Sequence, residues 1–296
     1  MPEPKPSLAK AQELRKLGYV RRNNPSGKGL LKIKDWFNPN DDSKTIISAQ
    51  EHIKSSHGYQ NYNIKLGNTT LLFETGIAIP YIEENYDTSI LIDKLPGFLY
   101  NPKCLKFKNN EDLNLIQGGY GSPAAIDTLE TIIAMGTKRV VIFGMCGGIG
   151  KDLEVGDLII PKEVIREEGT SYHYLKSGIN SEPDIELLHK AENFFTKHYE
   201  KKTFTGKTVS TDAVYRQTIN KEKSWREESI LGIDMESSAL LAVCSYYKIP
   251  AVSILIVSDK HNLDDKEDWN WGSKSFNNDR KKAIDLCIKF VAGYIV

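Results

Sequence analysis

The segment that most constrains the fold of this chain runs from residue 231 to residue 259. It predicts a helix that begins at the acid-methionine-acid triplet of residues 234–236 and continues with an apolar face. A β-branched run over residues 252–257 follows and leads to Asp259. Ligands of open α/β sheets gather at the carboxyl ends of the strands, so Asp259 is our first candidate for a catalytic residue.

Strand and helix signals alternate along most of the chain. Apolar or β-branched runs predict strands from residue 69 and at residues 104–107, 113–117, 139–144, 157–160 and 206–209. Apolar residues at helical spacing predict helices at residues 81–85, 124–136, 184–198 and 278–291. This alternation is typical of a single three-layer α/β domain, to which we assign residues 69–296.

Residues 1–68 differ from the rest of the chain, and we interpret them as an N-terminal helical extension. Ser7 is a suitable N-cap for a helix over residues 7–17, and a second helix is predicted near residues 43–56. Two roles remain open for this extension. It either packs on the main domain or contributes a lid or a subunit contact.

The charged residues of the chain balance, with 39 Lys and Arg against 39 Asp and Glu. This balance offers no long-range attraction to nucleic acid or to a membrane, so we expect a small-molecule partner. The four cysteines lie far apart and lack metal-ligand spacing, so we expect buried, reduced thiols and no metal site. No apolar run reaches the ~18 residues that span a bilayer, and no signal-peptide pattern opens the sequence, so we expect a soluble cytoplasmic protein.

Two glycine clusters each follow a predicted strand. The first, GGYGSP, contains Gly119 and Gly121 and leads into a predicted helix; the second, GMCGGIG, contains Gly144, Met145 and Gly147. Glycine allows backbone N–H groups to approach a ligand closely, and a helix N-terminus adds partial positive charge. These residues are therefore candidate substrate contacts, with tight turns that bind no ligand as the alternative.

Six motifs, in chain order, resemble those of the nucleoside phosphorylase superfamily. They are GGYGSPAAIDTLE, GMCGGIGKDLEVGDLIIP, REEGTSYHY, STDAVYR, GIDMESSALLAV and ILIVSD. This superfamily includes purine nucleoside and uridine phosphorylases, adenosylhomocysteine-type nucleosidases and AMP nucleosidase. The resemblance covers residue 71 to the C-terminus and implies a central mixed β-sheet flanked by helices. It also implies a homo-oligomer that cleaves the N-glycosidic bond of a ribonucleoside without a cofactor.

The resemblance assigns roles to three residues of this chain. Glu236 matches the acid that holds the ribose 2′- and 3′-hydroxyls, Met235 matches the residue that lines the sugar, and Asp259 matches the acid that protonates a departing purine. The chemistry agrees, because a carboxylate bonded to the sugar stabilises the oxocarbenium-like transition state, and an acid neutralises the leaving base. The alternatives are an exposed first-turn acid for Glu236 and an N-cap for Asp259.

Further residues are weaker candidates for the substrate pocket. Thr211, Asp212 and Tyr215 lie in the segment that resembles the base-pocket loop of the family, and Glu168 and Ser171 lie in a loop near the same pocket. Any of these side chains also fits a structural role.

The sequence departs from the phosphorolytic members of the family at several positions. Where those members carry an Arg and a Ser or Thr that bind phosphate, this chain has Ile142 and Met145, and Pro80 falls near the place of a further Arg. Arginine is the side chain best suited to bidentate phosphate contact, so these replacements put phosphate binding in question. An Arg that supports the catalytic Asp also lacks a counterpart. The residues available to fill that region are His261, Lys274 and Trp271.

The acceptor of the ribosyl group therefore stays open between phosphate and water. Water needs a carboxylate to activate it, and Glu74, Glu83 and Glu84 are the nearest candidates, whereas phosphate needs a displaced site. We rank phosphorolysis of a purine nucleoside first and hydrolysis by a nucleosidase second. A non-catalytic nucleoside-binding or storage protein on the same fold is the third reading.

Overall fold

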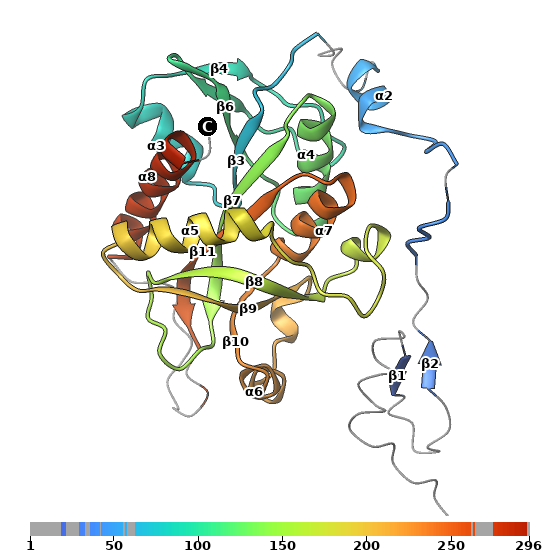
Figure 1. Cartoon of the computed structure of the whole chain (residues 1–296), viewed down its shortest axis with the longest axis vertical. Helices are drawn as coiled ribbons and strands as arrows, with labels where there is room; N and C mark the ends of the chain where they lie inside the picture. Colours follow the sequence, from blue (N-terminus) through green and yellow to red (C-terminus); the bar gives the residue numbers. More distant parts are fainter. Residues whose placement is uncertain are drawn as a thin grey trace, which may run out of the picture.

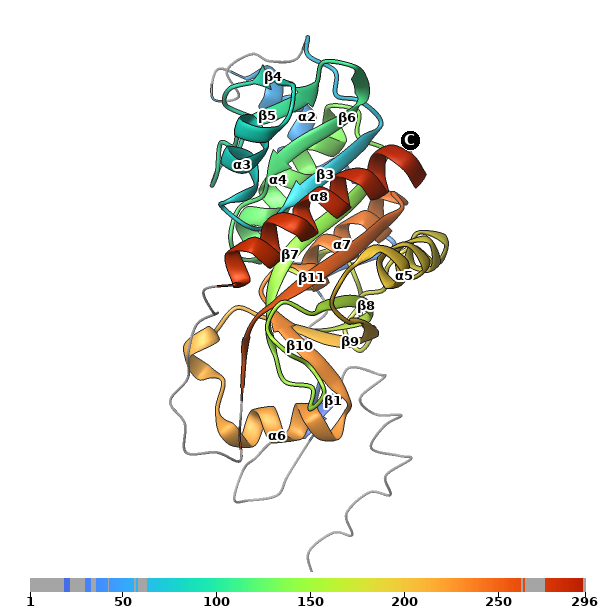
Figure 2. The same cartoon turned by 90° about the vertical axis from the view of Figure 1, so that its left-hand side faces the viewer.

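The computed structural model describes residues 19–21, 30–32, 36–41, 43–55, 57, 63–261, 263 and 275–294. Within these residues the predicted three-layer α/β fold is confirmed, with a central sheet between two layers of helices (Figure 1). Figure 2, turned by 90°, shows α8 and α5 in front of the sheet and α4 and α7 behind it.

A nine-stranded mixed sheet forms the centre of the domain, in the order β10-β9-β8-β11-β7-β3-β6-β5-β4. Its strands are β3 (Thr69–Phe73), β4 (Thr88–Ile92), β5 (Cys104–Phe107), β6 (Asn110–Gln117), β7 (Arg139–Gly148), β8 (Leu158–Glu167), β9 (Thr203–Thr211), β10 (Ile230–Asp234) and β11 (Ala251–Lys260). The end of β7 also pairs with β10, so that β7, β11, β8, β9 and β10 close into a small barrel.

Helices cover both faces of the sheet. They are α2 (Ala49–Lys54), α3 (Ala78–Asn85), α4 (Ser122–Ala134), α5 (Ile185–His198), α6 (Ile219–Glu227), α7 (Ser237–Tyr247) and α8 (Phe276–Tyr294), with short 3-10 helices η1 (Thr170–His173) and η2 (Val214–Arg216). The alternation of side chains along β3 and β7 divides the core. Leu71 and Phe143 pack with α3, α5 and α8, whereas Leu72 and Ile142 pack with α4 and α7.

The elements predicted for residues 69–296 are present, but several boundaries differ. Strands β7 and β8 are longer than their β-branched cores because pairing with β11 and β9 continues beyond those cores. Strands β4 and β10 and helix α6 were not predicted. The prediction that a helix begins at the acidic triplet is wrong: Asp234 ends β10, where it pairs with Ser210 of β9, and α7 begins at Ser237.

The described part of the N-terminal region contains strands as well as a helix. β1 (Tyr19–Arg21) and β2 (Leu30–Lys32) pair as an antiparallel ladder, and the predicted helix over residues 7–17 lies outside the described residues. The second predicted helix is shorter than expected, because a capping box between Ser48 and Glu51 sets the start of α2. No helix in the described ranges is long and apolar enough to cross a membrane. All four cysteines are buried free thiols, as expected.

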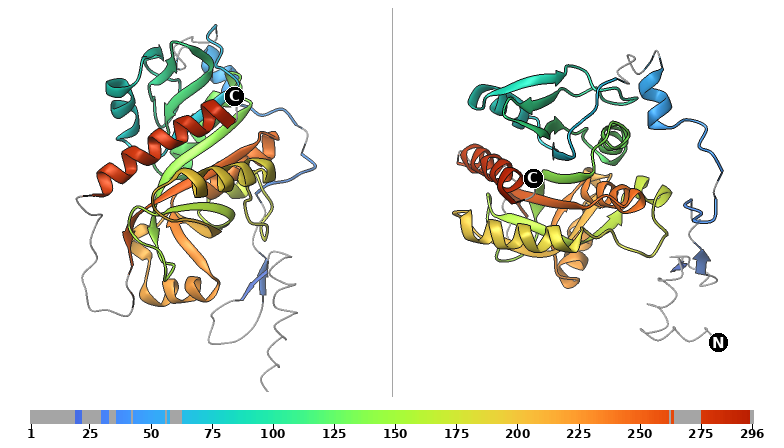
Figure 3. Two further views of the ribbon diagram at one scale, coloured as in Figure 1. Left: turned by 60° about the vertical axis from the view of Figure 1, so that its left-hand side comes forward. Right: turned by 45° about the horizontal axis from the view of Figure 1, so that its top comes forward.

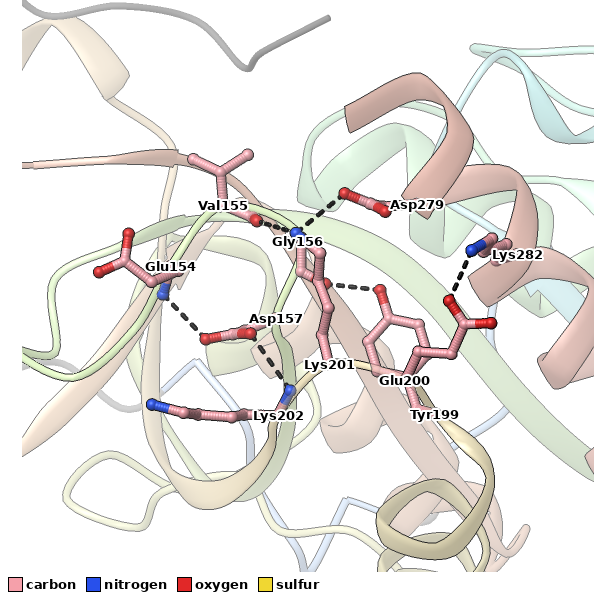
Figure 4. A network of polar contacts seen from close by, with 10 residues as sticks. All are labelled: Glu154, Val155, Gly156, Asp157, Tyr199, Glu200, Lys201, Lys202, Asp279 and Lys282. Atoms are coloured by element: carbon pink, nitrogen blue, oxygen red, sulfur yellow. Dashed lines mark hydrogen bonds and ion pairs between the residues drawn. The ribbon is translucent and has the colours of Figure 1, made fainter. Parts of the chain in front are cut away.

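Helix α8 is fixed against α5 and against the connection between α5 and β9. The two helices lie side by side in both views of Figure 3, and the rings of Phe194 and Phe290 lie 5.3 Å apart. Figure 4 shows the polar contacts at the start of α8, where Asp279 lies 3.0 Å from the ammonium group of Lys201. The Tyr199 hydroxyl donates to the Gly156 carbonyl at 2.5 Å. The first turns of α8 therefore have a defined position relative to β7 and β8.

Candidate active site

Glu236 lies in the turn between β10 and α7, where it is the N-cap residue of the helix. Its side chain is only 7% exposed, which excludes the reading of an exposed first-turn acid. Oε1 accepts the N–H of Gly121 at 2.6 Å, and Oε2 accepts the N–H of Met235 at 3.2 Å. The Ser122 hydroxyl donates to the Met235 carbonyl at 2.7 Å. These contacts join the first glycine cluster to the acidic triplet across more than a hundred residues of sequence, and Gly121 adopts a positive φ of 81° there.

The pKa of Glu236 is raised to about 8. Burial is the main cause and the nearby charge of Asp234 adds to it, while the N–H groups of Gly121 and Met235 act in the opposite direction. A second acid, Glu74, lies at the end of β3 and is 3% exposed. Neither of its carboxylate oxygens has a hydrogen-bond partner among the described residues. Burial, followed by the charges of Glu236 and Asp234, raises the pKa of Glu74 well above its usual range.

The two glycine clusters leave room for the Glu74 side chain. A Cβ atom on Gly118 would lie 1.9 Å from Glu74 Oε1, and one on Gly144 would lie 3.5 Å from the Glu74 Cβ. Of the other two acids considered for water activation, Glu83 pairs with Lys103 at 2.7 Å and Glu84 is exposed. Glu74 is therefore the one of the three whose pKa responds to the charge of Glu236.

Asp259 lies within strand β11, so it is not the N-cap of a following helix. Oδ1 accepts the Ser258 hydroxyl at 2.5 Å, and Oδ2 lies 2.9 Å from His261 Nε2. The other ring nitrogen of His261, Nδ1, lies 2.7 Å from Oε1 of Glu222 on α6. The bonds to Asp259 and Glu222 raise the pKa of His261 to about 9, so the imidazole is a cation near neutral pH. Of the three residues expected near Asp259, His261 makes contact, and Lys274 and Trp271 lie outside the described residues.

Gly147 of β7 lies between the two predicted catalytic acids. It pairs with Asp259 of β11 on one side and with Ile233 of β10, three residues before Glu236, on the other. A Cβ atom on Gly147 would lie 3.1 Å from His261 Nε2 and 3.7 Å from Asp259 Oδ2. The neighbouring Cys146 has a raised pKa because it is buried and because the charges of Asp234 and Asp259 both reach it. Asp259 thus comes from β11 and Glu236 from the turn after β10, and these two strands pair with β7 on either side of Gly147.

The weaker candidates from the two loops near the predicted base pocket occupy different environments. Glu168 and Ser171 are buried and bonded to each other, and the Ser238 hydroxyl at the start of α7 donates to Glu168 at 3.0 Å. Their side chains therefore support the start of α7. Thr211 is buried, and Asp212 accepts the N–H of Gly169 at 2.9 Å while its charge contributes to the raised pKa of Glu236.

Tyr215 lies on η2 and is 98% exposed, so its ring lines no buried surface of the described chain. Gly119 packs against α4, where an added Cβ atom would lie 2.6 Å from that of Ala124. Met145 contacts Arg280 of α8, with 3.4 Å between Sδ and Nη1. Glu222 and Arg280 were not predicted, because each lies in a strongly polar helical segment that resembles an ordinary solvated surface.

Comparison with known proteins identifies the family. The profile described as the phosphorylase superfamily matches residues 48–295. The chain is 32% identical over 201 residues to a DeoD-type purine nucleoside phosphorylase of Clostridium novyi, a match that covers 66% of this chain and 83% of that protein. It is 31% identical over 177 residues to the DeoD-type enzyme of Brevibacillus brevis, covering 58% of this chain and 74% of that protein.

Similarity of the fold extends to solved structures. The crystal structure of uridine phosphorylase from Vibrio fischeri superposes with a TM-score of 0.64 at 20% identity, covering 84% of this chain and 99% of that one. Both the sequence match, which spans most of the described domain, and the shared fold lead to the same assignment: this chain belongs to the phosphorylase superfamily.

Proposed function

We propose that this protein cleaves the N-glycosidic bond of a purine ribonucleoside and transfers the ribosyl group to inorganic phosphate. The observation that carries the proposal is the arrangement of two buried acids around Gly147, with Glu236 on one side and the Asp259–His261 pair on the other. The matches to purine nucleoside phosphorylases support a purine base and phosphate as the acceptor.

Glu236 acts on the sugar in this proposal. Its carboxyl group lies at the N-terminus of α7 and accepts the N–H groups of Gly121 and Met235. The ionised form is the active one in this proposal, so activity should increase as the pH rises toward its pKa of about 8. Positive charge develops on the ribose as the glycosidic bond breaks. A carboxylate that accepts hydrogen bonds from the ribose hydroxyls stabilises this charge more in the transition state than in the ground state.

Asp259 acts on the base. When the bond between the sugar and the base breaks, its electron pair moves to the base, which then needs a proton. Asp259, a carboxylate beside the His261 cation, takes a proton from His261 across 2.9 Å and passes it to the base, which leaves the imidazole neutral until solvent protonates it again. Glu222 holds His261 in its charged form from the opposite side of the ring. These three residues thus keep a proton available at the departing base.

Hydrolysis is the second candidate, and Glu74 is the observation that favours it. Its carboxyl group is buried, lacks a hydrogen-bond partner in the described chain and lies within reach of the charge of Glu236. An ionised Glu74 would take a proton from water, as a nucleosidase requires. A protonated Glu74, which its raised pKa favours near neutral pH, would instead donate a hydrogen bond to a phosphate oxygen.

One assay separates these functions. Purified protein is incubated with a panel of purine and pyrimidine nucleosides, with and without phosphate, and the free base and the sugar product are measured. Phosphorolysis requires base release that depends on phosphate and yields ribose 1-phosphate, whereas hydrolysis yields ribose without phosphate. Absence of base release from every nucleoside and nucleotide would instead support a non-catalytic binding protein.

A homo-oligomer, with residues 1–68 as a separate extension of the main domain, is also part of the proposal. The family profile begins at residue 48. Trp36 of the extension stacks on His173 of the main domain, with 4.9 Å between the ring centroids. Light scattering on the full chain and on a chain that begins at residue 69 tests both statements. The proposal requires an oligomer for the full chain and a folded domain for the shorter one.

A further inference from the structure

Arg280 is a cation on α8 whose described contacts are all neutral. Nη1 lies 3.4 Å from Met145 Sδ, Nη2 donates to Asn277 Oδ1 at 2.8 Å, and the guanidinium carbon lies 5.3 Å from the centre of the Phe276 ring. Nε is buried and has no hydrogen-bond partner among the described residues. Within the same residues no carboxylate lies at ion-pair distance from Arg280.

This environment destabilises the cation. Burial lowers the pKa of Arg280, and the opposing contribution comes from the phenol of Tyr120. A thioether is a weak hydrogen-bond acceptor, whereas a guanidinium group has five N–H donors arranged to bind an oxyanion through two parallel bonds. The donors of Arg280 are therefore suited to an anionic ligand.

The contacts of Arg280 lead toward the Glu236 side of the candidate active site. Met145, which Arg280 contacts, also accepts from the buried Thr75 hydroxyl at 3.9 Å, and Thr75 directly follows Glu74. Tyr120 accepts the N–H of Gly76 at 2.6 Å and directly precedes Gly121, whose N–H binds Glu236. Arg280 is thus linked to the loop of Glu74 through Met145, and the charge contribution of Tyr120 places it near the loop of Gly121.

The position of Arg280 is set by the contacts of its own helix. The preceding residue, Asp279, pairs with Lys201, and Lys282 pairs with Glu200 at 2.5 Å (Figure 4). These pairs lie on the side of α8 that faces the connection between α5 and β9, to which Glu200 and Lys201 belong. They hold the first turns of the helix while the Arg280 side chain extends to Met145.

We propose that Arg280 binds the phosphate group that takes part in the reaction, and that α8 thereby supplies the arginine that is absent at Ile142, Met145 and Pro80. This inference rests on the proposed function, because it identifies an anion contact of the same site. The ligand is a phosphate dianion. It is either free inorganic phosphate that accepts the ribosyl group or the 5′-phosphate of a nucleotide substrate.

The test compares Arg280→Gln and Arg280→Lys with the wild type. A matched control is Lys289→Gln, which removes a cation from an exposed position of the same helix. Phosphate affinity is measured by titration calorimetry with inorganic phosphate alone, and KM is measured separately for phosphate and for nucleoside. Circular dichroism and Tm establish that each variant is folded.

Loss of the charge-assisted bonds in Arg280→Gln should raise the KM for phosphate by roughly 10- to 100-fold and weaken phosphate binding by a similar factor. The KM for nucleoside should change much less. Arg280→Lys should recover part of the affinity because it keeps the charge without the bidentate geometry, and Lys289→Gln should behave as the wild type.

A parallel assay with a nucleoside 5′-monophosphate identifies the source of the phosphate. A wild-type preference for the nucleotide over the nucleoside that is lost in Arg280→Gln would support the anion site and assign it to a 5′-phosphate. If the wild type requires phosphate and folded Arg280→Gln keeps the same KM and affinity for it, the Arg280 assignment is wrong and the proposed function stands. Base release that is indifferent to phosphate, together with no phosphate binding and no nucleotide preference in the wild type, would reject phosphorolysis and the anion site together.

Discussion

His261 Nε2 lies 2.9 Å from Asp259 Oδ2. Both side chains lie beside Gly147, whose lack of a Cβ atom leaves room for the imidazole. Because Glu222 lies 2.7 Å from the other ring nitrogen, His261 is held as a cation between two carboxylates. The acid that we propose as the proton donor is therefore one end of a three-residue relay whose centre is His261. Glu236 stands apart from this relay, on the Ile233 side of Gly147.

Removing either predicted catalytic acid should lower the rate without unfolding the domain. We expect Glu236→Gln and Asp259→Asn each to reduce kcat/KM by at least ~10²-fold, the usual scale for a lost transition-state contact or proton donor. Glu186→Gln and Asp93→Asn make the same chemical changes at exposed positions and serve as controls. Steady-state kinetics of base release measures the effect, and wild-type rates in a folded acid variant would refute its assignment.

His261 should make the stability of the domain depend on pH. Its pKa is about 9 in the folded chain and 6.5 in the reference state, so the folded state binds the proton more tightly. This contribution is fully present below pH 6.5 and is lost as the pH rises through about 9. Its size is on the order of 2–3 kcal/mol of unfolding free energy.

Chemical denaturation from pH 6 to 10 measures that contribution. The decrease in unfolding free energy between pH 6.5 and 9 should be smaller in His261→Gln than in the wild type. His189, an imidazole that is 64% exposed on α5, provides the control His189→Gln. A wild-type decrease that persists unchanged in His261→Gln would show that the imidazolium between Asp259 and Glu222 does not produce it.

Glu74→Gln should distinguish the two acceptors. If the acceptor is phosphate and Glu74 serves as a neutral donor, the amide keeps an N–H donor and we expect kcat/KM within about 10-fold of the wild type. If water is the acceptor, the amide cannot take its proton, and the rate should fall by at least ~10²-fold. Rates of phosphate-dependent and phosphate-free base release give the answer, with exposed Glu84→Gln as the control.

Gly118→Ala should destabilise the domain through Glu74. The added Cβ atom would lie 1.9 Å from Glu74 Oε1, so the carboxyl group or the loop has to move, at a cost of about 1–3 kcal/mol of unfolding free energy. Urea denaturation measures this cost, and the double variant Gly118→Ala with Glu74→Ala should recover part of it. Gly293→Ala, where a Cβ atom meets nothing within 4 Å, is the control. Equal stability of Gly118→Ala and the wild type would mean that Glu74 does not occupy this position.

Local sequence patterns predicted most of the secondary structure and the two central acids. The β-branched run of β11 and the apolar spacing of α4, α5 and α8 were sufficient, because strand and helix periodicity depends on neighbouring residues. Glu236 and Asp259 could be identified from the sequence for a similar reason, since each lies in a short motif. The start of α7 was misplaced, because Asp234 is held in a strand by its pairing with β9, a contact that local propensity does not describe.

The surroundings of those acids depended on the tertiary structure. Glu222 meets His261 from a polar helix, and Arg280 reaches Met145 across 135 positions of sequence. The position of Glu74 likewise depends on Gly118, after β6, and on Gly144, within β7, both of which lie against its side chain. Side chains remote in sequence meet only when the barrel closes and the helices pack, and desolvation and neighbouring charges then set their protonation. The sequence by itself therefore determined the elements and the candidate acids Glu236 and Asp259, whereas packing decided which side chains surround those acids, because only the tertiary structure brings distant segments together.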